Sequence, residues 1–151
     1  MTILIIRFLD LLMAGLIAGV IFGIWIGYNP QSFSAQTYVE QQQSAIKALN
    51  TLMPLLGLIT ILLTIVSAFL QRDNKKVFIA LLIAVVFLIV SGLVTRFGNQ
   101  PINSIVMTWN KVEVPGNWTE LRDKWWSLHK IRTVTAVLAF CIIIWTNIKR
   151  A

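Results

Sequence analysis

One helical stripe in the last third of the chain gathers residue types that can do chemistry. Steps of four, three, four and three residues lead from Trp118 through Arg122, Trp125 and His129 to Arg132. At helical spacing these five side chains fall on one face of a helix. An imidazole can take up a proton near neutral pH, so His129 is a candidate general base. The stripe therefore predicts a site, in a chain whose surroundings are almost purely apolar.

The stripe has a second interpretation, as a girdle at the membrane surface. Tryptophan and arginine both favour the headgroup region of a bilayer. A girdle, however, does not require the histidine and both arginines to share one narrow sector of the helix. On the opposite side lie Asp123, Ser127 and Lys130, which form an ordinary solvated face.

A second polar segment precedes the stripe and reads Asn99-Gln100-Pro101-Ile102-Asn103. Pro101 stiffens the backbone, so the amides of Asn99 and Asn103 can be held in fixed positions, where each both donates and accepts hydrogen bonds. The same residues could instead form a loop cap over the helix before them, and spacing alone does not separate the two. We expect residues 98–116 to form an irregular loop with Pro101 and Pro115.

The composition is that of a membrane protein. Of 151 residues 57% are hydrophobic and only 13% are charged, which leaves too little polar surface for a soluble domain. The net charge of +7 reflects basic residues at the ends of apolar runs, so we expect no nucleic-acid partner. One cysteine, Cys141, and one histidine exclude the usual zinc sites, and we expect neither a metal nor another cofactor.

Four apolar runs predict an all-α, polytopic protein with a bundle of four transmembrane helices in a single domain, residues 1–151. About 20 apolar residues cross a bilayer as a helix. The fourth run is short, and the amphipathic stretch before it completes a helix over residues 117–147. Residues 29–51 are polar and predict an extension or an interfacial helix, and residues 71–76 a tight turn. The four runs are residues 3–28, 52–70, 77–97 and 133–148.

An even number of spans places both termini on one side of the membrane. The short turn carries Arg72, Lys75 and Lys76, and the chain ends carry Arg7 and the basic pair at 149–150. Basic residues in short loops favour the cytoplasm, although the opposite side carries no fewer of them. We therefore expect an integral protein of a bacterial inner membrane with cytoplasmic termini.

The first span carries a glycine at every fourth position: Gly15, Gly19, Gly23 and Gly27. Such a groove lets membrane helices approach closely. We expect it to pack inside the bundle, and the alternative is an interface between copies of the chain. Asp10 in the same span is costly in a membrane and suggests function, unless it lies at the headgroups or pairs with a nearby cation.

The segment 98–103, the pair Trp109-Asn110 and the stripe from Trp118 to Arg132 together resemble the signature of the anthrone-oxygenase-like family. Its members are small four-helix membrane proteins, and the resemblance covers nearly the whole chain in span layout. Characterised relatives are fungal enzymes that oxidise anthrones to anthraquinones with molecular oxygen and no evident cofactor.

The resemblance implies a cofactor-independent oxygenase acting on a planar aromatic or phenolic molecule. His129 would take a proton from an acidic C–H or O–H group of the substrate. Arg122 and Arg132 would stabilise the resulting anion, and Asn99 and Asn103 would orient its oxygen atoms. The positions expected to contact the substrate are Trp109, Trp118, Trp125 and Pro101.

The alternative is a protein without catalytic activity that binds a lipid or a quinone, or an accessory subunit of a membrane assembly. The two hypotheses differ in geometry. An enzyme needs His129 within hydrogen-bond reach of an enclosed pocket shared with Asn99 or Asn103. The sequence does not name the substrate.

Overall fold

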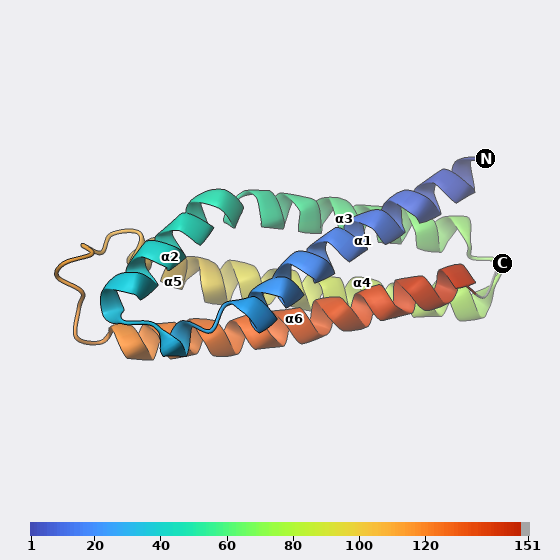
Figure 1. The fold of residues 1–151 in the computed structure, drawn as a ribbon. Coiled ribbons are helices and arrows are strands. Elements are labelled where there is room, and N and C mark those ends of the chain that lie inside the picture. Colours follow the sequence, from blue (N-terminus) through green and yellow to red (C-terminus); the bar gives the residue numbers. More distant parts are fainter. Residues whose placement is uncertain (149–151) are drawn as a thin grey trace.

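The fold is all-α in the computed structural model, which describes residues 1–148 (Figure 1). The described residues form six α-helices and two short helical segments, η1 (Pro30–Ser32) between α1 and α2 and the π-helical turn η2 (Val94–Asn99) between α4 and α5. The six α-helices are α1 (Thr2–Gly27), α2 (Ala35–Leu49), α3 (Leu52–Leu70), α4 (Lys75–Leu93), α5 (Gln100–Val106) and α6 (Trp118–Ile148).

Four helical segments are long and apolar enough to cross a membrane, namely Thr2–Ser32, Leu52–Leu70, Lys75–Val106 and Trp118–Ile148. Their outer faces carry leucine, isoleucine, valine and phenylalanine side chains that are exposed among the described residues. Such a surface is stable against lipid and not against water. The predicted integral membrane bundle of four helices is therefore confirmed.

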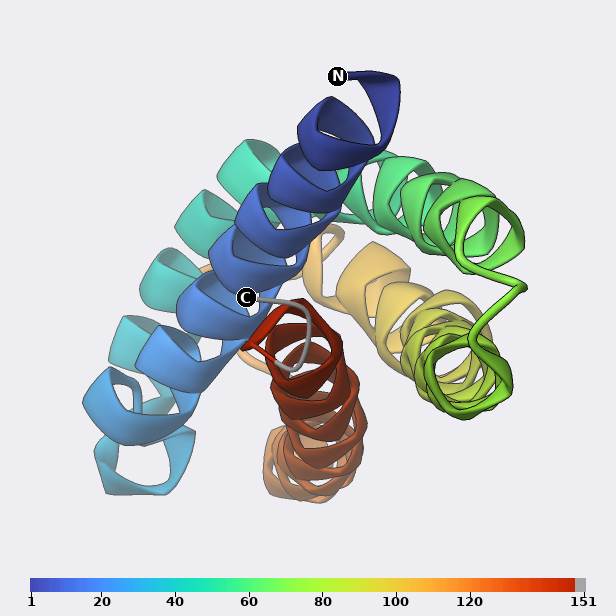
Figure 2. The ribbon, with the colours of Figure 1, turned by 90° about the vertical axis from the view of Figure 1, so that its right-hand side faces the viewer.

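The four long helices form a closed ring, in which α6 packs on α1 and α4, and α3 packs on the same two helices (Figures 1 and 2). The N-terminus, the C-terminal end of α6 and the turn between α3 and α4 lie at one end of the bundle, while α2 and α5 lie at the other (Figure 1). The basic pair predicted at the C-terminal end, residues 149–150, lies outside the described residues.

The polar segment between the first two spans forms α2, as its helical alternative predicted. The Ser34 side chain caps this helix by accepting a hydrogen bond from the Thr37 backbone N–H. Tyr38, Gln42 and Ile46 follow one another at four-residue steps and are buried. This face of α2 therefore covers one end of the bundle.

The prediction of a loop over residues 98–116 is wrong for its first half. The chain stays helical from α4 through η2 into α5, which ends at Val106. Pro101 has no N–H to donate to the preceding turn, so a regular α-helix is interrupted there. The interruption takes the form of the π-helical turn just before it, a feature often found at functional sites. Asn99 and Asn103 therefore lie on one continuous helical segment.

The glycine groove of α1 is mostly not packed inside the bundle. A Cβ atom at Gly15 would lie 3.2 Å from the Phe140 ring, whereas at Gly19, Gly23 and Gly27 it would meet no atom within 4 Å. The expectation of close packing within one chain is thus wrong for three of the four glycines. An interface with a second copy stays a prediction.

Gly98 on η2 is where close approach is required. A Cβ atom there would lie 3.0 and 3.1 Å from the two methyl carbons of Leu128 on α6. We expect Gly98→Val to destabilise the protein by about 1–3 kcal/mol, because an overpacked contact forces neighbours apart. Gly19→Val is the matched control, and thermal unfolding in detergent is the measurement. If both variants lose the same stability and Gly19→Val also forms a smaller oligomer, the glycine face of α1 packs against another copy of the chain.

Asp10 is not paired with Arg7. Its carboxylate is fully buried and accepts a hydrogen bond of 2.7 Å from the Thr64 hydroxyl on α3. Arg7 donates instead to the side chain and backbone oxygens of Asn147, at 3.1 and 2.9 Å. Asp10 thus joins α1 to α3 inside the bundle.

Thr64→Val should therefore lower stability by about 1–3 kcal/mol, because it deprives a buried carboxyl group of a donor. Thr135→Val is the control, since the Thr135 hydroxyl bonds only to carbonyl groups of its own helix. Thermal unfolding of both variants in detergent measures the difference. Equal stability of the two would show that the Asp10 carboxyl group does not depend on this hydroxyl.

Candidate functional site

A cavity of about 120 Å³ lies beneath α2, which contributes Gln42, Ala45, Ile46 and Leu49 to its wall. All four membrane-spanning segments contribute to its wall, which is apolar over most of its surface. Apolar cavities with a few convergent polar groups are typical of small-molecule sites. The polar and aromatic side chains on the wall are Tyr28, Gln42, Asn50, Thr95, Asn103, Trp125 and Arg132.

One hydrogen-bond network fixes five of these side chains. The Asn103 Oδ1 atom accepts from Trp125 Nε1 at 2.9 Å and from Gln42 Nε2 at 3.4 Å. The Asn103 amide donates to Asn50 Oδ1 at 2.8 Å, and the Tyr28 hydroxyl donates to Gln42 Oε1 at 2.8 Å. The network joins α1, α2, α5 and α6, so the polar side of the cavity is already ordered without a ligand.

Arg132 brings a positive charge to the cavity wall and is bonded to the histidine behind it. Its Nε and Nη2 atoms lie 3.1 and 2.9 Å from His129 Nδ1, and its Nη1 atom lies 3.4 Å from Thr95 Oγ1. A guanidinium group only donates, so Nδ1 accepts and Nε2 carries the hydrogen. That hydrogen is donated to the carbonyl oxygen of Ile21, 3.1 Å away.

Arg132 has no carboxylate partner within residues 1–148, where the ion pair is Arg122–Asp123. An unpaired cation inside a membrane span is costly, and such residues usually face a cavity and mark a substrate or ion pathway. The arrangement is suited to an anion, or to an oxygen atom that becomes negative during a reaction.

His129 is buried behind this wall rather than on it. Its ring is 0% exposed and is stacked against Trp125 and Trp126, with centroids 5.2 and 5.4 Å apart. It is not among the residues that line the cavity, whereas Arg132, bonded to its Nδ1 atom, is. A ligand in the cavity therefore meets Arg132 before it can meet His129.

Asn99 also lies behind the wall. Its amide donates to the Trp125 backbone carbonyl at 3.0 Å, and the side chain is fully buried. This bond ties the π-helical turn η2 to α6 at the level of the cavity. Asn99 thus positions Trp125, whose ring nitrogen bonds to Asn103.

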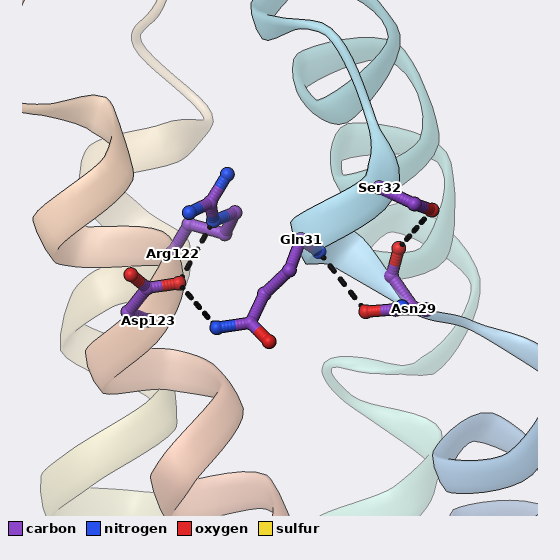
Figure 3. Close-up of polar contacts among 5 residues, drawn as sticks. All are labelled: Asn29, Gln31, Ser32, Arg122 and Asp123. Atoms are coloured by element: carbon purple, nitrogen blue, oxygen red, sulfur yellow. Dashed lines mark hydrogen bonds and ion pairs between the residues drawn. The ribbon is translucent and has the colours of Figure 1, made fainter.

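Arg122 and Trp118 lie at the rim of the bundle, outside the cavity. Arg122 Nε is 2.9 Å from Asp123 Oδ1, to which Gln31 on η1 donates at 3.1 Å (Figure 3). The Arg122 guanidinium also lies 4.8 Å from the Trp118 ring centroid. Trp118 packs in turn against Tyr38, where burial raises the pKa of the phenol. Arg122 is thus satisfied where it is.

The η1 segment that carries Gln31 is fixed by its own capping contacts. The Asn29 side chain accepts from the Gln31 backbone N–H at 3.2 Å, and the Ser32 hydroxyl donates to the Asn29 carbonyl at 2.8 Å (Figure 3). Because these bonds order the turn after α1, Gln31 can reach Asp123 on α6.

Trp109 and Pro101, predicted to contact the substrate, do not line the cavity. The Trp109 carbonyl accepts from Gln43 Nε2 at 3.0 Å, a bond that ties the loop after α5 to α2. Pro101 is exposed on α5. The predicted residues that the structure brings to the cavity are Asn103, Trp125 and Arg132.

Sequence reasoning missed Tyr28, Gln42, Asn50 and Thr95. A signal existed for Gln42, since it stands four residues after Tyr38 and four before Ile46, on the apolar face of α2. A polar residue on such a face is often part of a site. Within the part of the chain that the structure describes, no three histidine, cysteine or acidic side chains lie close enough to hold a metal ion.

Comparisons with known proteins identify one family. A family model described as anthrone oxygenase matches residues 43–142. The matched region contains Asn103, Trp125, His129 and Arg132, while Tyr28 and Gln42 precede it. No match to the chain is found among curated proteins or among solved structures.

Proposed function

Because the chain belongs to the anthrone oxygenase family, we propose that it oxidises a planar aromatic or phenolic molecule with O2 in the cavity beneath α2. The observation that carries the proposal is Arg132, a guanidinium that has no carboxylate partner among residues 1–148 and lies on the wall of an apolar cavity between the four long helices. It is suited to a substrate whose oxygen becomes negative when a neighbouring C–H group loses its proton.

Binding would orient the substrate between Arg132 and the amide network. The substrate oxygen faces the guanidinium, and a second oxygen function is held by Asn103 or Gln42, which can both donate and accept. The rings of Tyr28 and Trp125 lie on the same wall and are suited to a flat aromatic molecule.

The base in this proposal is His129, acting once Arg132 has turned towards the substrate. His129 Nδ1 is occupied by Arg132 in the structure. The carbonyl or phenol oxygen of a bound substrate competes for the same N–H donors, and their departure frees the Nδ1 lone pair. That lone pair takes the proton from carbon, while Arg132 stabilises the enolate that remains.

Oxygen then reacts with the electron-rich anion. The carbanion donates its electrons to O2, a C–O bond forms, and the peroxide takes up a proton. Loss of the second proton from the same carbon breaks the O–O bond, forms C=O and releases hydroxide, which is protonated to water. A CH2 group and O2 thus become a carbonyl group and water, with the carbon oxidised and both oxygen atoms reduced.

The experiment is to supply an anthrone and O2 to the purified protein in lipid nanodiscs. Anthraquinone absorbance and O2 uptake should rise together, in equal amounts, above the rate of nanodiscs without protein. If the anthrone binds but no quinone forms above that rate, the protein binds a lipid or a quinone-like molecule without catalysis. If it does not bind at all, the substrate assignment is wrong.

For the cell, we propose a bacterial inner membrane with cytoplasmic termini. The support is the short turn with Arg72, Lys75 and Lys76, which lies at the same end of the bundle as the described N-terminus. In this orientation the cavity lies near the outer surface of the membrane.

A further inference from the structure

A second cavity, of about 230 Å³, lies deeper in the membrane span than the first. Its wall extends to Ile17 on α1 and Ile61 on α3, both further from α2 than any residue of these helices that lines the first cavity. Leu88 on α4 closes the same side. The proposed chemistry beneath α2 makes no use of this space.

The two cavities meet at a shared wall, and Arg132 belongs to both. Met53 is also part of that wall, and its unbranched side chain can adapt to what lies beside it. One molecule can therefore place its polar end in the first cavity and extend past Arg132 into the second. The shared residues are Ile21, Met53, Pro54, Thr95 and Arg132.

The polar side chains on the wall of the second cavity already have hydrogen-bond partners in other residues of the protein. Arg96 donates to Gln100 Oε1 at 2.9 Å, and Gln100 donates to the Asn50 carbonyl at 3.1 Å. The Ser91 hydroxyl donates to the Arg132 carbonyl at 3.0 Å, and the Thr95 hydroxyl donates to the Ser91 carbonyl at 2.9 Å. The rest of the wall is apolar, so this cavity favours a hydrocarbon occupant.

Two glycines on facing helices give the second cavity its width. Both Gly57 on α3 and Gly92 on α4 line it, and a Cβ atom at either would meet no atom within 4 Å. Leu58, also on the wall, is 55% exposed on the outer surface of α3. The cavity thus reaches the lipid-facing side of the bundle, where a molecule dissolved in the bilayer can enter.

We propose that the second cavity holds an apolar chain of the substrate, whose polar aromatic end lies in the first cavity. The substrate class is then a phenol or aromatic ketone with an alkyl or isoprenoid chain, taken from the bilayer between α3 and α4. The proposal rests on the proposed function for the identity of the polar end. An empty apolar cavity forfeits the dispersion contacts that such a chain restores.

The experiment compares the binding of phenol and para-octylphenol in lipid nanodiscs, measured by tryptophan fluorescence. For each variant the readout is the Kd of phenol divided by the Kd of para-octylphenol. Partition of the two ligands into the lipid is the same for every variant, so it cancels when these ratios are compared. Gly57→Leu and Gly92→Leu should each lower the preference for octylphenol by about tenfold, because their side chains fill the space that the chain needs. Gly19→Leu is the matched control, since Gly19 is also helical and open but lies outside the cavity.

Equal preference in wild type and both cavity variants would overturn the proposal. So would a phospholipid retained by the wild type and lost from Gly57→Leu in native mass spectrometry, because a membrane lipid would then be the occupant. If the leucine variants unfold, Gly57→Ala and Gly92→Ala should still reduce the preference in part. Anthrone oxidation by the wild type tests the proposed function separately, so either one can fail while the other stands.

Discussion

Arg132→Gln is expected to lower kcat for anthrone oxidation by about a hundredfold or more, the usual effect of removing one preorganised donor to a developing oxyanion. The glutamine keeps a polar side chain on the cavity wall but removes the charge. Arg132 is the only cation that the structure places on the wall of the first cavity within residues 1–148, so no neighbour there can replace it. Quinone absorbance at saturating substrate measures kcat.

Lys130→Gln is the matched control, because Lys130 lies two positions away on the same helix and is exposed. Both variants lose one positive charge, so a general effect of net charge would appear in both. Arg132→Lys separates charge from geometry, since an ammonium group cannot reproduce the paired N–H groups directed at His129 Nδ1. An Arg132→Gln variant with wild-type kcat would remove Arg132 from the reaction.

The fold could be read from the sequence because lipid imposes a simple rule. A segment of about 20 apolar residues must form a helix in a bilayer, where backbone groups find no water. The four spans followed from that rule, whereas the stripe from Trp118 to Arg132 followed from helical spacing. The continuation of α4 through η2 to Val106 did not, because Pro101 normally marks a helix end and a π-helical turn has no simple sequence signature.

The candidate site was only partly predictable, since helical phase assigns a face but not its neighbours. Arg122 and Arg132 share a helix face, yet Arg122 forms an ion pair with Asp123 at the rim of the bundle, whereas Arg132 lines the cavity. The difference lies in what packs opposite each residue, which depends on α1 and α2. Gln42 entered the site for the same reason, because α2 folds over the end of the bundle.

The role of His129 can be separated from that of a buried structural residue. Its ring is stacked against Trp125 and Trp126 and hydrogen-bonded at both nitrogens, so replacement by alanine removes packing as well as a possible base. His129→Gln is therefore the better variant, because an amide oxygen can still accept from Arg132. Trp126→Phe is the control for packing, since Trp126 is stacked against the His129 ring without lining either cavity.

If His129 is the base, His129→Gln should lower kcat by about 10² to 10⁴-fold, the usual contribution of a general base, with little change in KM. Trp126→Phe should leave kcat within a few-fold of the wild type. Added imidazole should restore part of the activity of His129→Gly, because a small base can enter the space left by the ring. A merely structural histidine would give no such rescue. Wild-type kcat in His129→Gln would leave His129 as a positioning residue for Arg132 and require another base.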